Sequence, residues 1–218
     1  MILVFSVAGA VCMVVCQWFI FFLAPAEAEM GEIQKLFYLH FPLAIWALIY
    51  FFMVFAGSVV YLFRGSFAIA DFCRACGETG VLCCGLALFT GMIWARKSWG
   101  VWWTWDPRLA TTLAAFFIYS VYLLIRGLDL PESKKNAAQA VVGIVAFLDV
   151  PLVFLSARIF RSIHPAVFAS RDGGLPPEMK WIIAACCLSL GLFTYGLVLF
   201  RKKQLEMERE IKKALGRL

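Results

Sequence analysis

The densest group of residues suited to chemistry is a run of tryptophans in the middle of the sequence. Four of the eight tryptophans fall close together, at Trp99, Trp102, Trp103 and Trp105. Indole rings favour the membrane–water interface, which accounts for one or two such residues but not for four packed around a glycine. Helical spacing predicts that Trp99, Trp102 and Trp103 share one face. We therefore expect a flat apolar surface suited to a large planar aromatic ligand.

Asp106 and Pro107 directly follow the tryptophans. Aspartate is a favourable N-cap residue, and proline is well tolerated in the first turn of a helix. This pair predicts the start of a helix immediately after the tryptophan-rich segment.

The sequence contains only two histidines, His40 and His164. A single histidine beside an apolar helix is more often a hydrogen-bonded structural residue than a ligand. Here we expect both histidines at helix ends on the same side of a membrane as the tryptophans. Two neutral imidazoles that face each other beside an aromatic surface would form an axial ligand pair for haem iron.

Arginines near these histidines could bind the two propionates of haem. Arg158, Arg161 and His164 recur at three-residue spacing, so a helix would hold them near one face. Guanidinium groups pair well with carboxylates, and Arg108 and Arg96 are further candidates. The alternative is that these arginines extend toward lipid headgroups.

The composition identifies the elements that must position these residues. The chain has 218 residues, of which 63% are hydrophobic and 16% charged, with a mean hydropathy of +0.85. These values exclude a soluble domain and a disordered chain, and indicate an all-α polytopic membrane protein. Six transmembrane helices are predicted at residues 2–24, 41–63, 79–95, 109–125, 137–157 and 181–200. The first run lacks a basic start, so we expect it to be retained rather than cleaved.

The distribution of charge orients the six helices. The net charge is +6, and most basic residues lie after spans two and four and in residues 201–218. This pattern predicts that both termini are cytoplasmic and that the tryptophan-rich loop, residues 96–109, is an interfacial segment at the outer face. We expect residues 1–200 to form the membrane domain. Residues 201–218 should form a basic amphipathic cytoplasmic tail on the lipid surface or, alternatively, against an ATPase complex. No nucleic-acid surface is expected.

Eight cysteines raise the possibility of redox chemistry. Cys73 and Cys76 form a CxxC motif, but Gly77 follows where a covalent haem-attachment motif has histidine. The motif is expected on the cytoplasmic side, where thiols stay reduced. We interpret the cysteines as small helix-packing residues, with a thiol relay as the alternative.

Asp149 lies within the fifth predicted span, two residues before Pro151. An acidic residue at membrane depth is either functional or a protonated structural residue. Pro151 leaves a backbone carbonyl without its helical donor and is expected to kink the span.

The segment WGVWWTWDPRL resembles the WGxWWxWDxRL signature of the tryptophan-rich haem-handling proteins of cytochrome c maturation, and most closely the CcmC family. The same resemblance includes LAPA at 23–26, YLHFP at 38–42, Thr90-Gly91 and His164, and so covers almost the whole chain. One departure is Ala110, where this family commonly has threonine.

The resemblance implies a haem-binding delivery protein of the bacterial inner membrane that is not an enzyme. Haem b would sit at the periplasmic face, with His40 and His164 as axial ligands and the four tryptophans as its platform. Asp106 and Arg108 would shape the site or contact a partner. The implied partners are a membrane-anchored CcmE-like haem chaperone, CcmA-like and CcmB-like ABC transporter subunits, and a small CcmD-like one-span subunit.

Three other functions fit parts of the sequence. A two-haem b-type electron carrier needs four histidines within its spans, whereas this chain has two near helix ends. A thiol–disulfide relay would depend on Cys73 and Cys76. A complete haem–apocytochrome ligase usually has more spans and a large outer domain.

Overall fold

The computed structural model describes residues 2–24, 31–160, 162–164 and 175–215, with the backbone alone at 157 and 158. The described residues are helical apart from short connections. In chain order the helices are α1 (Ile2–Phe22), η1 (Glu32–Leu36), α2 (Phe37–Arg64), α3 (Phe67–Trp99), α4 (Pro107–Leu124), η2 (Ile125–Gly127), α5 (Glu132–Ala146), α6 (Asp149–Ile159) and α7 (Pro177–Ala214). Six helical stretches in this part of the chain are long and apolar enough to cross a membrane. The all-α, six-span prediction is confirmed.

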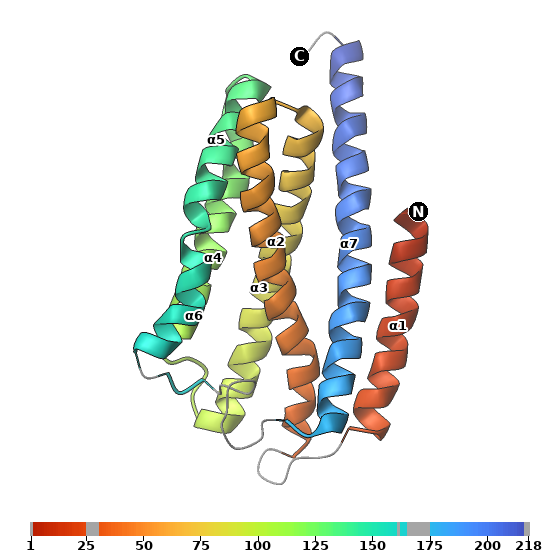
Figure 1. Cartoon of the computed structure of the whole chain (residues 1–218), viewed down its shortest axis with the longest axis vertical. Helices are drawn as coiled ribbons and strands as arrows, with labels where there is room; N and C mark the ends of the chain where they lie inside the picture. Colours follow the sequence, from red (N-terminus) through yellow and green to blue (C-terminus); the bar gives the residue numbers. More distant parts are fainter. Residues whose placement is uncertain (1, 25–30, 161, 165–174, 216–218) are drawn as a thin grey trace.

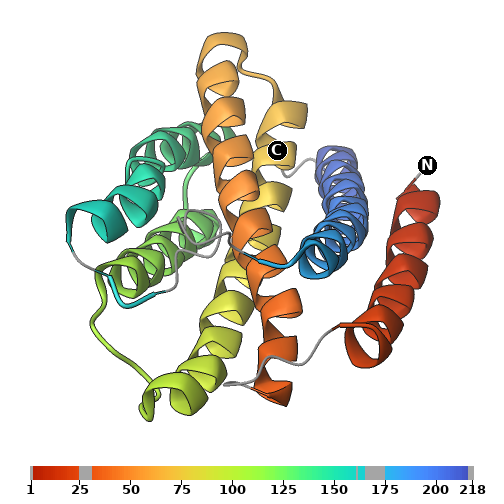
Figure 2. The ribbon, with the colours of Figure 1, turned by 60° about the horizontal axis from the view of Figure 1, so that its bottom comes forward.

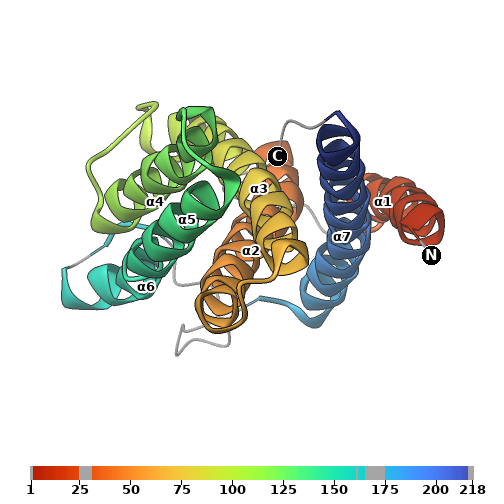
Figure 3. The ribbon, with the colours of Figure 1, turned by 90° about the horizontal axis from the view of Figure 1, so that it is seen from above.

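Helices α2 and α3 pack along each other at the centre of the bundle, as Figures 1 and 3 show. α7 and then α1 lie on one side of this pair, and α4, α5 and α6 lie on the other (Figure 2). α2 begins, α3 ends and α4 begins at the lower end in Figure 1. We call this lower end the histidine end, and the opposite end, where α7 finishes, the C-terminal end.

Aromatic residues fill the centre of the bundle. Tyr50, Phe51, Tyr119 and Tyr122 are buried, and the rings of Phe51 and Tyr119 stack with centroids 3.7 Å apart. The Tyr50 hydroxyl donates a hydrogen bond to Thr194 Oγ1 at 2.8 Å. The stacked rings join α2 to α4, and the hydrogen bond joins α2 to α7. The hydrogen bond also satisfies two polar groups that would find no water inside a membrane.

Small residues bring α1 close to α7. A methyl group at Gly9 would lie 2.3 Å from the backbone nitrogen of Phe193, and one at Gly196 would lie 2.4 Å from Ser6 Oγ. Glycine at both positions allows the two backbones to approach, as small residues do between membrane helices.

The structure corrects the prediction for the region before the third span. The predicted spans leave residues 64–78 as a cytoplasmic loop, but only Gly65 and Ser66 connect α2 to α3. Gly65 supplies the left-handed turn, with φ of 61°. Cys73 and Cys76 therefore lie buried on α3 within the bundle, and all eight cysteines are free. Their burial agrees with the interpretation as packing residues.

The fifth predicted span is two helices. The break falls at Phe147 and Leu148, where turn hydrogen bonds replace the helical ladder. Pro151 has no N–H to offer the Phe147 carbonyl, which accepts from the Val150 N–H at 3.1 Å instead, so the break lies where the missing donor of Pro151 disturbs the helix. Asp149 opens α6, and its buried Oδ2 has no hydrogen-bond partner among the described residues. Its role stays a prediction.

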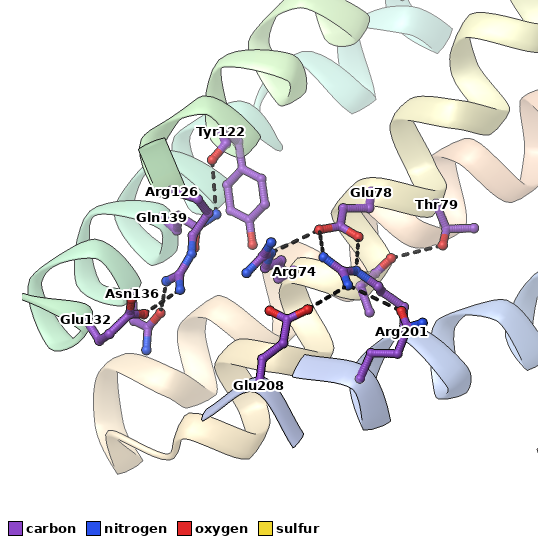
Figure 4. Close-up of polar contacts among 12 residues, drawn as sticks. Arg74, Glu78, Thr79, Tyr122, Arg126, Glu132, Asn136, Gln139, Arg201 and Glu208 are labelled. Carbon is purple, nitrogen blue, oxygen red and sulfur yellow. Dashed lines mark hydrogen bonds and ion pairs between the residues drawn. The ribbon is translucent and has the colours of Figure 1, made fainter. Parts of the chain in front are cut away.

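The last helix does not stop at the membrane boundary that we predicted. α7 has 38 residues, which corresponds to about 57 Å, whereas a hydrocarbon core is about 30 Å thick. Residues 201–214 thus continue the helix along its own axis, and their placement against the lipid surface or an ATPase complex stays a prediction. Ion pairs to α3 and α5 hold the tail there, and Figure 4 shows the one between Arg201 and Glu78.

Candidate functional site

His40 lies in the first turns of α2 and contacts α3. Its Nδ1 is 3.0 Å from the carbonyl oxygen of Ala87 and 3.1 Å from Thr90 Oγ1. A carbonyl only accepts hydrogen bonds, so Nδ1 carries the ring hydrogen and Nε2 keeps its lone pair. A methyl group at Gly91 would lie 3.0 Å from His40 Cε1, and glycine there leaves room for the ring. His40 is thus oriented as metal-binding histidines usually are.

His164 lies opposite His40 at the histidine end. The two ring centroids are 6.5 Å apart and the ring planes are inclined by 35°. Arg108 Nη1 lies 3.1 Å from His164 Nδ1. Two histidines separated by more than a hundred residues therefore face each other across a short gap, as the sequence predicts.

Asp106 positions the segment that carries His164. Its Oδ1 accepts hydrogen bonds from the backbone N–H of Arg108 at 2.9 Å and from Ser162 Oγ at 3.0 Å. Its Oδ2 accepts one from the backbone N–H of Ile163 at 2.8 Å. Asp106 is the N-cap of α4, which confirms the predicted helix start, and it also ties residues 162–164 to that start.

The surroundings of the buried Asp106 carboxylate favour its ionised form. Burial alone would raise its pKa, but hydrogen bonds from Ser162, Ile163 and Arg108 outweigh that effect and hold the pKa below its usual value. Asp106 therefore acts only as an acceptor near neutral pH, which its three donors require.

The tryptophans form two edge-to-face pairs rather than one flat face. Trp99 packs against Trp94 with centroids 5.5 Å apart and planes at 88°, and Trp103 packs against Trp105 at 5.9 Å and 85°. Trp102 lies 5.9 Å from the Arg96 guanidinium. Trp102 and Trp105 are 55% and 78% exposed.

The helical arrangement expected for Trp99, Trp102 and Trp103 is wrong. Gly100 has φ of 75° and ends α3 in the left-handed conformation, so residues 100–106 are not helical. The signal for this end was present in the sequence, because glycine is the residue that most often follows a helix.

The arginine predictions have mixed outcomes. Arg108 reaches His164, and its buried Nε has no hydrogen-bond partner among the described residues. Arg96 donates to the carbonyl of Gly100 and does not contact either histidine in the described structure. The side chain of Arg158 and the whole of Arg161 lie outside the described residues.

Sequence reasoning missed the groups that orient the two rings. The Ala87 carbonyl and Thr90 hold His40, and Ser162 and Ile163 connect the His164 segment to Asp106. Thr90-Gly91 was noted only as part of a resemblance. The Ala87 carbonyl and the Ile163 N–H are backbone groups, which carry no signal in a sequence.

These features define a class of protein: a six-span helical membrane protein with a two-histidine site beside a tryptophan-rich segment. The chain belongs to the CcmC family, described as heme exporter protein C, whose family model matches residues 1–216.

Several relatives named heme exporter protein C are similar to this chain. The protein from Rhodobacter capsulatus is 35% identical over 156 residues, covering 70% of this chain and 63% of the relative. The protein from Paracoccus denitrificans is 33% identical over 136 residues, covering 62% and 56%. The protein from Escherichia coli K12 is 28% identical over 186 residues, covering 82% and 74%. The match thus spans between about half and three quarters of these relatives' length.

Proposed function

We propose that this protein binds haem b as cargo at the histidine end, with His40 and His164 as the two axial ligands. The spacing of the two rings carries this proposal. An imidazole nitrogen lies about 2 Å from a bound metal ion, and the ring centre about 1 Å further away. Two coaxial ligands therefore place their ring centres about 6 Å apart, close to the observed 6.5 Å.

The surrounding residues fit such a cargo. The buried Nε of Arg108 is a donor without a partner in the described structure, as expected beside a binding site for a carboxylate. The segment that leads into Asp106 supplies aromatic surface, from Trp99, Trp102, Trp103 and Trp105. Arg158 and Arg161 remain candidates for a second propionate.

We further propose that the histidine end faces the periplasm at the bacterial inner membrane, with both termini in the cytoplasm. The concentration of basic residues at the opposite end supports this orientation. The exposed rings of Trp102 and Trp105 would then be available to a partner in that compartment.

Delivery of the haem follows from this placement. The relatives are named heme exporter proteins. We propose a delivery protein rather than an enzyme. It would pass haem to a membrane-anchored CcmE-like chaperone during cytochrome c maturation, in association with CcmA-like, CcmB-like and CcmD-like transporter subunits.

Absorption spectroscopy of the purified protein tests this function. We expect the parent to give a six-coordinate haem spectrum that the chaperone strengthens. His40→Ala and His164→Ala should each weaken that spectrum, because each removes one ligand. Glu210→Gln, at the exposed far end of α7, is the matched control and should leave it unchanged. A parent that cannot be loaded with haem, even with the chaperone present, would refute the proposal.

A further inference from the structure

The contact between Arg108 and His164 fixes the position of the imidazole hydrogen. A guanidinium group has five N–H donors, no acceptor, and a charge that it does not lose in proteins. Because Arg108 Nη1 lies 3.1 Å from His164 Nδ1, this nitrogen must accept. In the neutral ring the hydrogen then sits on Nε2.

The two histidines of the site are therefore opposite tautomers. His40 donates from Nδ1 to the Ala87 carbonyl, and its Nε2 lone pair is available to a metal. His164 holds its hydrogen on Nε2, and a protonated nitrogen does not bind a metal ion. One ring is ready to ligate, and the other is not.

We propose that Arg108 keeps His164 from ligating until a carboxylate of the cargo binds Arg108 and draws it away from Nδ1. This inference rests on the proposed function and deepens it. It makes binding ordered: His40 is the first ligand, and His164 becomes the second only for a ligand that carries a suitably placed carboxylate. Arg108 is thereby a positioning residue that selects for propionates.

The surroundings of Arg108 support this role independently. Its buried Nε has no partner, and no carboxylate of the described residues lies within ion-pair distance of its guanidinium. Asp106 is the nearest acid in sequence, and its oxygens accept hydrogen bonds from Ser162, Ile163 and the Arg108 backbone. A half-buried guanidinium with an unused donor is a site for an incoming anion.

The proposed change at His164 is an exchange of tautomers that conserves the number of protons and the charge of the ring. The carboxylate takes the guanidinium hydrogen bonds, and Nδ1 is released. The ring then gives its Nε2 proton to water and takes one from water at Nδ1. His164 is neutral before and after, no electrons move, and the ring lone pair is now on Nε2.

Nitrogen NMR of the haem-free full chain in lipid bilayers tests the tautomers directly. The chain has only two histidines, so ¹⁵N-histidine labelling gives two ring signals, which His40→Ala assigns. In alkaline buffer, where both rings are neutral, we expect the hydrogen on Nδ1 of His40 and on Nε2 of His164. Arg108→Leu should move the His164 hydrogen to Nδ1 or mix the two forms. A parent His164 with its hydrogen on Nδ1 overturns the proposal, whether or not the variant folds.

Haem and its dimethyl ester, in which both carboxylates are blocked, test the selection. The parent should give a six-coordinate low-spin spectrum with haem and lose it with the ester, which His40 alone would hold. Arg108→Leu should abolish that difference, so that both ligands give the same coordination. Arg64→Leu, which removes an exposed arginine in the last turn of α2 at the C-terminal end, is the control and should keep the difference.

The outcomes separate the two proposals. A low-spin spectrum of the ester in the parent overturns the role of Arg108 but leaves haem binding intact. Failure of the parent to bind either ligand refutes the haem site, while the NMR result still decides the tautomer.

Discussion

The two ends of the bundle treat their charged groups in opposite ways. At the C-terminal end, Glu78 pairs with Arg74 and Arg201, at 2.9 Å and 2.7 Å, and Glu132 binds Arg126 (Figure 4). At the histidine end, by contrast, Arg108 keeps an unused donor and contacts an imidazole instead of an acid. At the C-terminal end the charged side chains pair with one another, which stabilises the fold. At the histidine end a guanidinium N–H donor is left for a ligand.

The same contrast holds for the backbone. α3 and α7 run side by side through the C-terminal end without a break, whereas non-helical residues 100–106 and 162–164 form much of the histidine end. Binding groups are commonly placed on irregular segments that a rigid scaffold holds. We therefore expect substitutions at the two ends to have separable effects on stability and on haem binding.

Asp106→Ala should have the largest effect, because one carboxylate both caps α4 and holds the His164 segment. We expect loss of the six-coordinate haem spectrum, together with about 1 to 2 kcal/mol of stability from the lost cap. Spectra and thermal unfolding in detergent measure the two effects. Asp106→Asn keeps a capping oxygen and should retain most of the stability. An unchanged haem spectrum in Asp106→Ala would mean that His164 is positioned by other contacts.

Glu78→Ala should show the reverse pattern. It leaves Arg74 and Arg201 without their carboxylate at a half-buried position, and we expect a loss of about 1 to 2 kcal/mol. The haem spectrum should stay as in the parent. Glu210→Ala, which breaks an exposed pair with Lys213, is the control and should cost less. A changed haem spectrum in Glu78→Ala would show that the two ends are coupled.

Gly91→Ala should weaken haem binding several-fold without unfolding the protein. The added methyl group would lie 3.0 Å from His40 Cε1, so the ring must shift away from its present hydrogen bonds. Haem titration measures the affinity. Gly85→Ala places a methyl group 3.1 Å from Phe116 on the same helix and should leave the affinity unchanged. Equal loss in both variants would trace the effect to the packing of α3 and not to His40.

Lowering the pH should have the smallest effect of these changes on the stability of the fold. The pKa of Asp106 is lower in the folded chain than in the unfolded one, so its ionised form stabilises the fold. That contribution is present above the unfolded value of about 4 and is lost as pH falls through the folded value. Unfolding temperatures of the parent and Asp106→Asn should therefore differ by a constant amount from neutral pH to about pH 5 and converge below it. A difference that already shrinks near neutral pH would mean that Asp106 is not ionised as inferred.

The sequence was most informative where a residue type has few uses. Two histidines in an apolar chain predicted that the two imidazole rings lie close together, and an aspartate followed by proline predicted the start of α4. Apolar runs likewise predicted each span. In these cases the chemistry of the side chain, or the length of the run, determines the outcome locally.

The sequence was least informative where distant partners decide the structure. The predicted spans leave residues 64–78 as a loop, yet Asp71, Arg74 and Glu78 lie on α3, where α3 itself and α7 supply their partners. The orientation of His40 depends on a carbonyl 47 positions away, and that of the His164 segment on a carboxylate 57 positions from Ile163. Such pairings follow from the packing of helices, which composition and periodicity do not encode.

The length of α7 has a mechanical consequence. After Pro177 the helix contains no proline, and it runs as one straight rod from the histidine end to residue 214 beyond the opposite end (Figure 1). A helix without such a break bends only gently, so α7 moves as a single rigid body. A force applied near Ala214 is therefore carried along the whole length of α7 to Pro177 at the histidine end.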